Sequence, residues 1–199
     1  ERPLAFDALV VDEGQDFLEE WWVPLEDLLR DRSDGVFHVF MDPHQQLREK
    51  GGKPPFHFEA STFLSANCRN TRVIASSGAS LARVDIDLMP GTPAGAPPKL
   101  IQVSGPSAQP TQVVTIIRTL LSGGLKTSQL VLLGPAARDK GSLSGLGRVD
   151  GIPFVADAER WRKGEGLLVT TPRSFKGLEA DAIILYDLSG FGAGFTERD

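Results

Sequence analysis

The chain has 199 residues, of which 41% are hydrophobic and 24% are charged, and its formal net charge is −5. This composition is typical of a globular protein with a sizeable core, and it excludes a uniformly basic nucleic-acid surface without excluding a local basic groove. The single cysteine, Cys68, excludes an internal disulfide and the usual zinc clusters and is compatible with a reducing compartment.

No apolar stretch is long enough to span a bilayer, and no signal peptide is present, so we expect a cytoplasmic protein with no membrane partner. The first residue is Glu1 rather than Met, from which we expect a piece of a longer protein.

Strand-like apolar runs alternate with helical patterns along the chain. Strands are predicted at 8–11, 36–41, 58–64, 99–103, 129–133, 152–155, 166–170 and 182–186. Helices are predicted at 18–29, where Pro24 lies in a first turn or a kink, at 71–83, at 111–121 and, more weakly, at 138–147. Pro- and Gly-rich stretches at 51–55 and 90–98 are predicted as loops. This alternation predicts an α/β fold with a mainly parallel sheet.

The acidic string after the first apolar run is the most informative motif. Ala8 to Val11 run directly into Asp12-Glu13, as in a buried parallel strand with acids at its carboxyl end, where ligands bind in open α/β sheets. Asp12 could hold Mg²⁺ through its water shell, and Glu13 could orient or deprotonate a water that attacks a γ-phosphate. This is the Walker B arrangement. The simpler alternative is a strand end whose acids cap the next helix.

Two later segments place polar side chains after strands. Asp42 and Gln45 follow the second strand, where a glutamine can donate to a γ-phosphate oxygen and accept from the attacking water. Arg69 lies at a strand-to-helix junction, where its guanidinium could stabilise charge on a transferring phosphate. Taken alone, the first segment favours a Pro-containing turn with solvated side chains, and a surface or capping role is the more common one for an arginine such as Arg69.

The segment 170–181 combines hydroxyls, two cations, a glycine and acids between two apolar strands. Thr171, Arg173 and Ser174 could bind a phosphate backbone, and Glu179 could bind a ribose hydroxyl. The alternative for this segment is a short capped helix with solvated charges.

In this order, the four segments resemble the UvrD/Rep family of superfamily 1 DNA helicases. The string from Asp12 to Asp16 resembles motif II, Asp42 with Gln45 resembles motif III, and Asn67-Cys68-Arg69-Asn70 resembles motif IV. The stretch from Thr171 to Glu179, with Ser174-Phe175-Lys176-Gly177-Leu178-Glu179, resembles motif V and is the most specific of the four.

The resemblance implies RecA-like domains of the P-loop NTPase type: the end of a first domain over residues 1–66 and a nearly complete second domain over 67–199. It implies ATP and Mg²⁺ as cofactors and single-stranded DNA as a partner. The catalytic residues would be Asp12, Glu13, Gln45 and Arg69. The ATP-binding residues would be Gln15, Asp42, Lys176, Gly177 and Glu179. The nucleic-acid contacts would be Thr171, Arg173 and Ser174.

The sequence contains no Gly-x-x-x-x-Gly-Lys-[Ser/Thr] phosphate loop and no arginine-bearing motif VI. We therefore expect missing N-terminal and C-terminal parts of the same protein as partners, and a fragment that is inactive alone. Two alternatives remain at this point. One is a non-enzymatic RecA-like module that binds DNA or a protein, and the other is a metal-dependent nuclease using Asp7, Asp12, Glu13 and Asp16 as a two-metal site.

Overall fold

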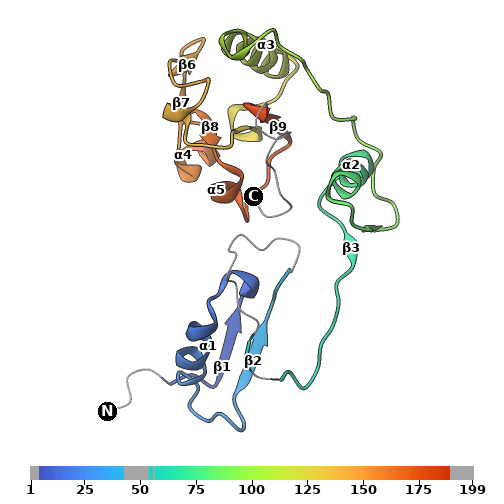
Figure 1. The fold of residues 1–199 in the computed structure, drawn as a ribbon, viewed down its shortest axis with the longest axis vertical. Helices are drawn as coiled ribbons and strands as arrows, with labels where there is room; N and C mark the ends of the chain where they lie inside the picture. The colour runs from blue at the N-terminus through green and yellow to red at the C-terminus, as the bar shows by residue number, and fades with distance from the viewer. Residues whose placement is uncertain (1–4, 43–53, 56, 189–199) are drawn as a thin grey trace. The chain divides into compact units, whose positions relative to one another are not determined.

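A computed structural model describes residues 5–42, 54–55 and 57–188 of the chain (Figure 1). The chain divides into two compact units, one formed by 1–53 together with 103–199 and the other by 54–102. Each unit is described by itself below. The domain boundary predicted between residues 66 and 67 stays a prediction.

The first unit contains a five-stranded sheet in the order β6-β7-β8-β5-β9. Its strands are β5 (Leu130–Leu133), β6 (Arg148–Val149), β7 (Ile152–Val155), β8 (Leu167–Thr170) and β9 (Ala182–Leu185). The pairs β7–β8, β8–β5 and β5–β9 are parallel, and only the β6–β7 hairpin is antiparallel. The prediction of an α/β fold with a mainly parallel sheet is therefore confirmed.

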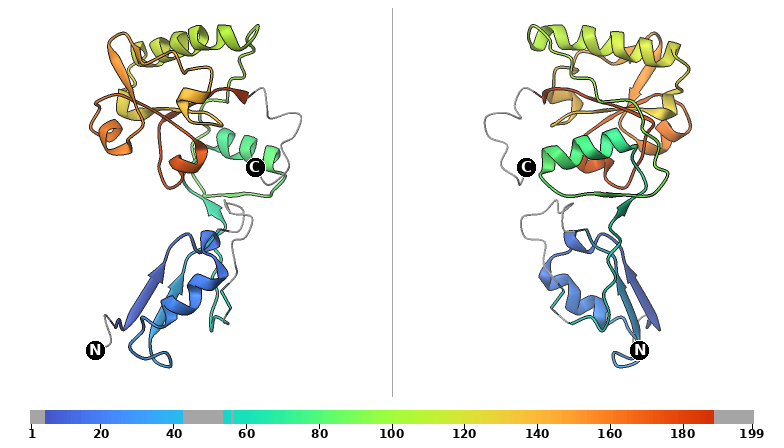
Figure 2. Two further views of the ribbon diagram at one scale, coloured as in Figure 1. Left: turned by 60° about the vertical axis from the view of Figure 1, so that its left-hand side comes forward. Right: turned by 90° about the vertical axis from the view of Figure 1, so that its right-hand side faces the viewer.

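Both faces of this sheet are covered, as parallel sheets require. The central strand β5 alternates between the two cores, with Leu130 and Leu132 on one face and Val131 and Leu133 on the other. Helix α3 (Gln109–Ser122) covers the first face with Val113 and Ile117, and it lies along the sheet in Figure 2. Helices α4 (Ala158–Arg162) and α5 (Pro172–Phe175) cover the second face, where their buried members are Trp161 and Phe175.

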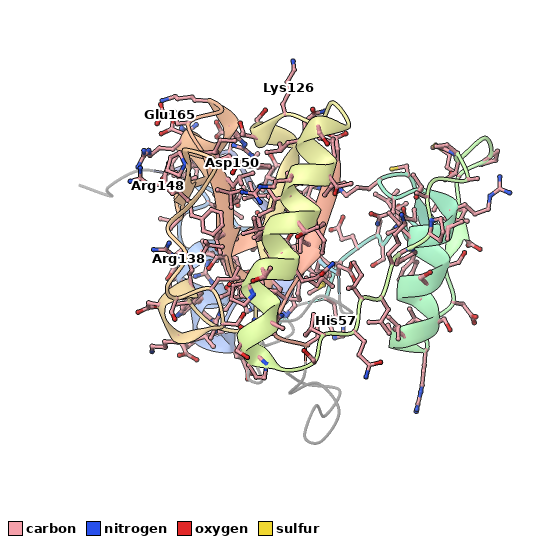
Figure 3. All side chains as sticks on the ribbon, turned by 90° about the horizontal axis from the view of Figure 1, so that it is seen from above. His57, Lys126, Arg138, Arg148, Asp150 and Glu165 are labelled. Atoms are coloured by element: carbon pink, nitrogen blue, oxygen red, sulfur yellow. The ribbon has the colours of Figure 1, made fainter. Side chains whose placement is uncertain are left out.

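The β6–β7 hairpin turns through Asp150 and Gly151, both at positive φ, as a two-residue Asp-Gly turn requires. Arg118 of α3 donates two hydrogen bonds to the Asp150 carboxylate, at 2.9 and 2.6 Å. Figure 3 shows Asp150 beside α3. The turn is thereby tied to the helix that covers the sheet.

The first unit also contains a small parallel pair, β1 (Ala8–Val11) with β2 (Val36–Val39), and the helix α1 (Glu19–Glu26) between them in sequence. The buried face of this pair centres on Trp22 of α1, which is fully buried and packs near Phe17 and Phe37. Pro24 lies inside α1, which ends at Glu26 rather than at the predicted residue 29.

The second unit contains the parallel pair of β3 (Ala66–Asn67) with β4 (Asp87–Leu88) and the helix α2 (Arg72–Ala82). Helix α2 agrees with the predicted 71–83. The Pro- and Gly-rich stretch at 90–98 is a loop, as expected, with Gly91 and Gly95 at positive φ.

Three predicted elements are wrong. The described residues of 58–64 form no strand, and Phe63 and Leu64 are 90% and 88% exposed, because apolar residues become a strand only when a neighbouring strand supplies hydrogen bonds. The segment 99–103 is likewise irregular, with Leu100 92% exposed. The predicted helix at 138–147 is reduced to one 3-10 turn, Arg138–Lys140, in a glycine-rich stretch that opposes helix propagation.

Candidate functional site

The candidate site begins at the carboxyl end of β1, where the chain turns sharply. Glu13 adopts a left-handed conformation, φ 54° and ψ 40°, and a 3-10 turn follows at Gly14–Asp16. Non-glycine residues occupy this region rarely, and such strain concentrates at functional sites.

Gly14 allows the close approach of this turn to β2. Its amide donates to the carbonyl of Phe40 at 2.9 Å. A Cβ atom at this position would lie 2.7 Å from Val39 Cγ1 and 3.2 Å from the Trp22 ring. Glycine at position 14 therefore fixes the acidic turn against the end of the neighbouring strand.

Gln15 holds the Glu13 carboxylate from inside the protein. Its side chain is buried, with 4% of the residue exposed, and its Nε2 donates to Glu13 Oε2 at 2.5 Å. Its Oε1 accepts from the backbone amide of Asp42 at 2.9 Å. The two predicted ATP-binding positions 15 and 42 are thus brought together with Glu13, through the main chain in the case of Asp42.

Lys176 joins the segment after β8 to this acidic turn. Its Nζ lies 2.6 Å from Asp16 Oδ2 and 2.8 Å from Glu13 Oε2, and its side chain is only 12% exposed. Burial opposes the charge of this ammonium, but the hydrogen bonds to Asp16 and Glu13 outweigh it, so the pKa of Lys176 is raised above its ordinary value. Residues 160 positions apart in sequence therefore share one charged cluster.

The segment that carries Lys176 is built by capping and by one turn. Thr171 is the N-cap of α5, and its Oγ1 accepts from the amide of Ser174 at 3.2 Å. Phe175 is buried in the second core, which fixes α5 against the sheet. Gly177 follows at φ 79°, a left-handed conformation that favours glycine and reverses the chain after Lys176.

The remaining predicted site residues lie on the following elements. Arg173 and Ser174 are exposed on α5, and Glu179 is exposed beyond Gly177. Arg69 is exposed just after β3 in the second unit, so its predicted convergence with the carboxylates stays a prediction. Gln45 lies outside the described residues.

Asp16 lies in the same acidic string, but the helicase interpretation gave it no role in the site, and only the nuclease alternative did. Its role depends on Lys176, which comes from a distant segment. The available signal was the spacing of Glu13 and Asp16, three residues apart, which can place two carboxylates around one cation.

The four acids of the nuclease alternative are not gathered. Asp7 precedes β1 and pairs with Arg30 at 2.8 Å, whereas Asp12 follows β1. Four strand residues at about 3.3 Å each separate the two ends by more than 10 Å. Within the described ranges, no group of three or more His, Cys, Asp and Glu side chains could hold a metal ion. The structure therefore gives no support to the two-metal alternative.

A magnesium ion held mainly by water and phosphate fits the turn better. The Asp12 side chain is exposed, and its Oδ1 accepts from the Glu13 amide at 2.9 Å, which orients the carboxylate. One oriented, hydrated carboxylate is a usual protein contribution to an Mg²⁺–phosphate complex. The sequence contains no loop that could cradle the other phosphates of a nucleotide.

No protein-family model matches this chain, and no curated protein matches it. In the part of the chain that the structure describes, no helix combines the length and the apolar character needed to cross a membrane.

Proposed function

We propose that this chain is part of an ATP-dependent DNA helicase or translocase of the UvrD/Rep type, with RecA-like domains that bind ATP and Mg²⁺. The observation that supports this most directly is the contact of Lys176 with Glu13 and Asp16. It brings the motif V-like segment to the Walker B-like acids, two of the four segments on which the resemblance rests.

The proposed roles follow from the chemistry of each side chain. Asp12 would hold Mg²⁺ through water, and the ion would offset phosphate charge. Glu13 would orient the attacking water, with its Oε2 fixed by Gln15. Gln45 would contact the γ-phosphate, and Arg69 would stabilise charge that develops on it. Asp42, Gly177 and Glu179 would complete the nucleotide site, while Thr171, Arg173 and Ser174 would contact DNA phosphates.

The chain itself should not turn over ATP, because no phosphate loop cradles the triphosphate. A steady-state assay of phosphate release, with and without single-stranded DNA, checks this. Turnover that disappears in Glu13→Gln would contradict the expected inactivity of the isolated chain, and magnesium-dependent DNA cutting without ATP would favour a nuclease instead.

DNA binding can be tested on the same chain by fluorescence anisotropy of a labelled single-stranded oligonucleotide over a salt series. We expect affinity to fall with salt, and Arg173→Met to flatten the slope of log K against log salt by about 0.7, the value for one phosphate contact. The matched control is Arg162→Met, which removes an exposed arginine from α4. Failure to bind at low salt would contradict the DNA-binding part of the proposal.

A further inference from the structure

Lys176 is needed in two places if the proposed function is correct. In this structure its ammonium is shared between Asp16 Oδ2 and Glu13 Oε2, at 2.6 and 2.8 Å. The proposed nucleotide site requires the same ammonium near phosphate oxygens. Two of the three N–H donors of this ammonium serve the carboxylates, which leaves one donor for a phosphate oxygen, and the negative charges of Glu13 and Asp16 repel a triphosphate that approaches while they remain in place.

Glu13 is constrained by the same contact. Its Oε2 accepts from Lys176 and from Gln15 Nε2 at the same time, so that oxygen is unavailable to an attacking water. Gln15 is buried and is held in turn by the Asp42 amide, whereas Lys176 has a flexible four-carbon stem followed by Gly177. Of the two donors to Glu13, Lys176 is therefore the one that can leave.

We propose that the Lys176–Glu13–Asp16 contact is an exchangeable ion pair: a triphosphate draws Lys176 away from the acidic turn, and Glu13 Oε2 is thereby released to orient water. This inference rests on the proposed function. It assigns Lys176 a second position and makes Asp16 a positioning residue, which holds the ammonium when no nucleotide is bound. Nucleotide binding then frees the Glu13 carboxylate to orient water in the same step.

The test is a titration of the full chain with tripolyphosphate in the absence of Mg²⁺. NMR spectra of the ¹⁵N-labelled lysine ammonium groups and of the backbone amides are recorded at each concentration. Asp16→Asn removes one anchor of the ammonium while conserving side-chain shape. We expect it to bind tripolyphosphate about tenfold more tightly than the unchanged chain, because one charge-assisted hydrogen bond no longer has to be broken. Asp16→Ser is a second variant with the same expectation if Asp16→Asn does not fold.

Removing a negative charge near an anion site raises affinity by itself, so a double-mutant cycle is needed. If Asp16 acts through Lys176, the gain from Asp16→Asn disappears in a Lys176→Met background. An equal gain in that background, or equal affinity of Asp16→Asn and the unchanged chain, overturns the exchangeable ion pair but leaves the nucleotide site intact. If tripolyphosphate at millimolar concentration perturbs neither Lys176 nor the amides of 12–16, both the exchange and the proposed nucleotide site fail.

Discussion

At the scale of single residues, the acidic turn depends on Gly14. The left-handed Glu13 and the hydrogen bond from Gly14 to Phe40 place the backbone so close to β2 that a Cβ atom at position 14 would meet Val39 and Trp22. Trp22 is fully buried, so its ring cannot move aside without disturbing the packing of α1 on the β1–β2 pair.

Gly14→Ala should therefore destabilise the protein by about 1–3 kcal/mol, the usual result of adding a methyl group to a filled space. Urea denaturation measures this. The control is Gly145→Ala, in the same unit, where a Cβ atom would meet nothing within 4 Å. Equal stability of the two variants would mean that Gly14 is not in close contact with β2.

Lys176→Met should lower the free energy of unfolding at pH 7 by about 1–2 kcal/mol. This loss is smaller than the roughly 3–5 kcal/mol that breaking a fully buried ion pair costs, because the Glu13 side chain is 42% exposed and water screens its charge. The raised pKa means that the folded state holds the proton more tightly than the unfolded chain, so the contribution is complete below pH 10.5 and is lost as pH rises through the raised pKa. The difference between wild type and variant, measured by denaturation from pH 7 to 11.5, should therefore be constant and then shrink. A difference that grows with pH would contradict the ion pair.

The sequence indicated which residue types gather at this site but not how they are joined. Asp12, Glu13, Gln15 and Lys176 were all predicted, because acids after an apolar run and a dense polar loop are local patterns. Asp16 as a partner of Lys176 could not be predicted, because its role depends on a contact across 160 residues. The left-handed Glu13 was equally hidden, since nothing in the residue type requires it.

At the scale of elements, Trp161 ties helix α4 to the sheet. Trp161 is 2% exposed, and its Nε1 donates to the carbonyls of Thr127 and Leu130 at 2.9 and 3.1 Å. Its ring also meets Phe175 of α5. The two short helices on this face therefore share an aromatic contact.

Trp161→Phe should destabilise the protein by about 1–3 kcal/mol, because the carbonyls of Thr127 and Leu130 lose their shared donor and a small space opens. Thermal unfolding followed by circular dichroism checks this. Trp21→Phe is the matched control and should change stability by about 0.5 kcal/mol or less, because Trp21 is 40% exposed. A Trp161→Phe protein as stable as the control would show that α4 is held by other contacts.

Elements were predictable where periodicity and burial agree. Helices α2 and α3 were predicted within a few residues from apolar positions at helical spacing, and strands β5, β7, β8 and β9 were predicted from short apolar runs. The segments 58–64 and 99–103 have equally apolar residues but no ladder partner among the described residues, and pairing depends on the rest of the fold rather than on local sequence.

At the scale of the whole molecule, the central proposal is that the turn after β1 and the segment after α5 belong to one nucleotide site. Both follow parallel strands at their carboxyl ends, where ligands bind in open α/β sheets, and Lys176 brings them together. Because the sequence contains no phosphate loop, the affinity of this chain for ATP should be weak, with a dissociation constant of about 1 mM or higher, roughly 4 kcal/mol of binding free energy.

The most direct test is an NMR titration of the ¹⁵N-labelled chain with Mg²⁺–ATP to about 10 mM, a concentration chosen for millimolar binding. We expect progressive shifts of the amides of Asp12 to Asp16 and of Lys176 to Glu179, and loss of these shifts in Lys176→Met while Lys163→Met, an exposed lysine beside α4, retains them. Shifts confined to other parts of the chain, or none at all, would contradict the proposal that these two segments form a nucleotide site.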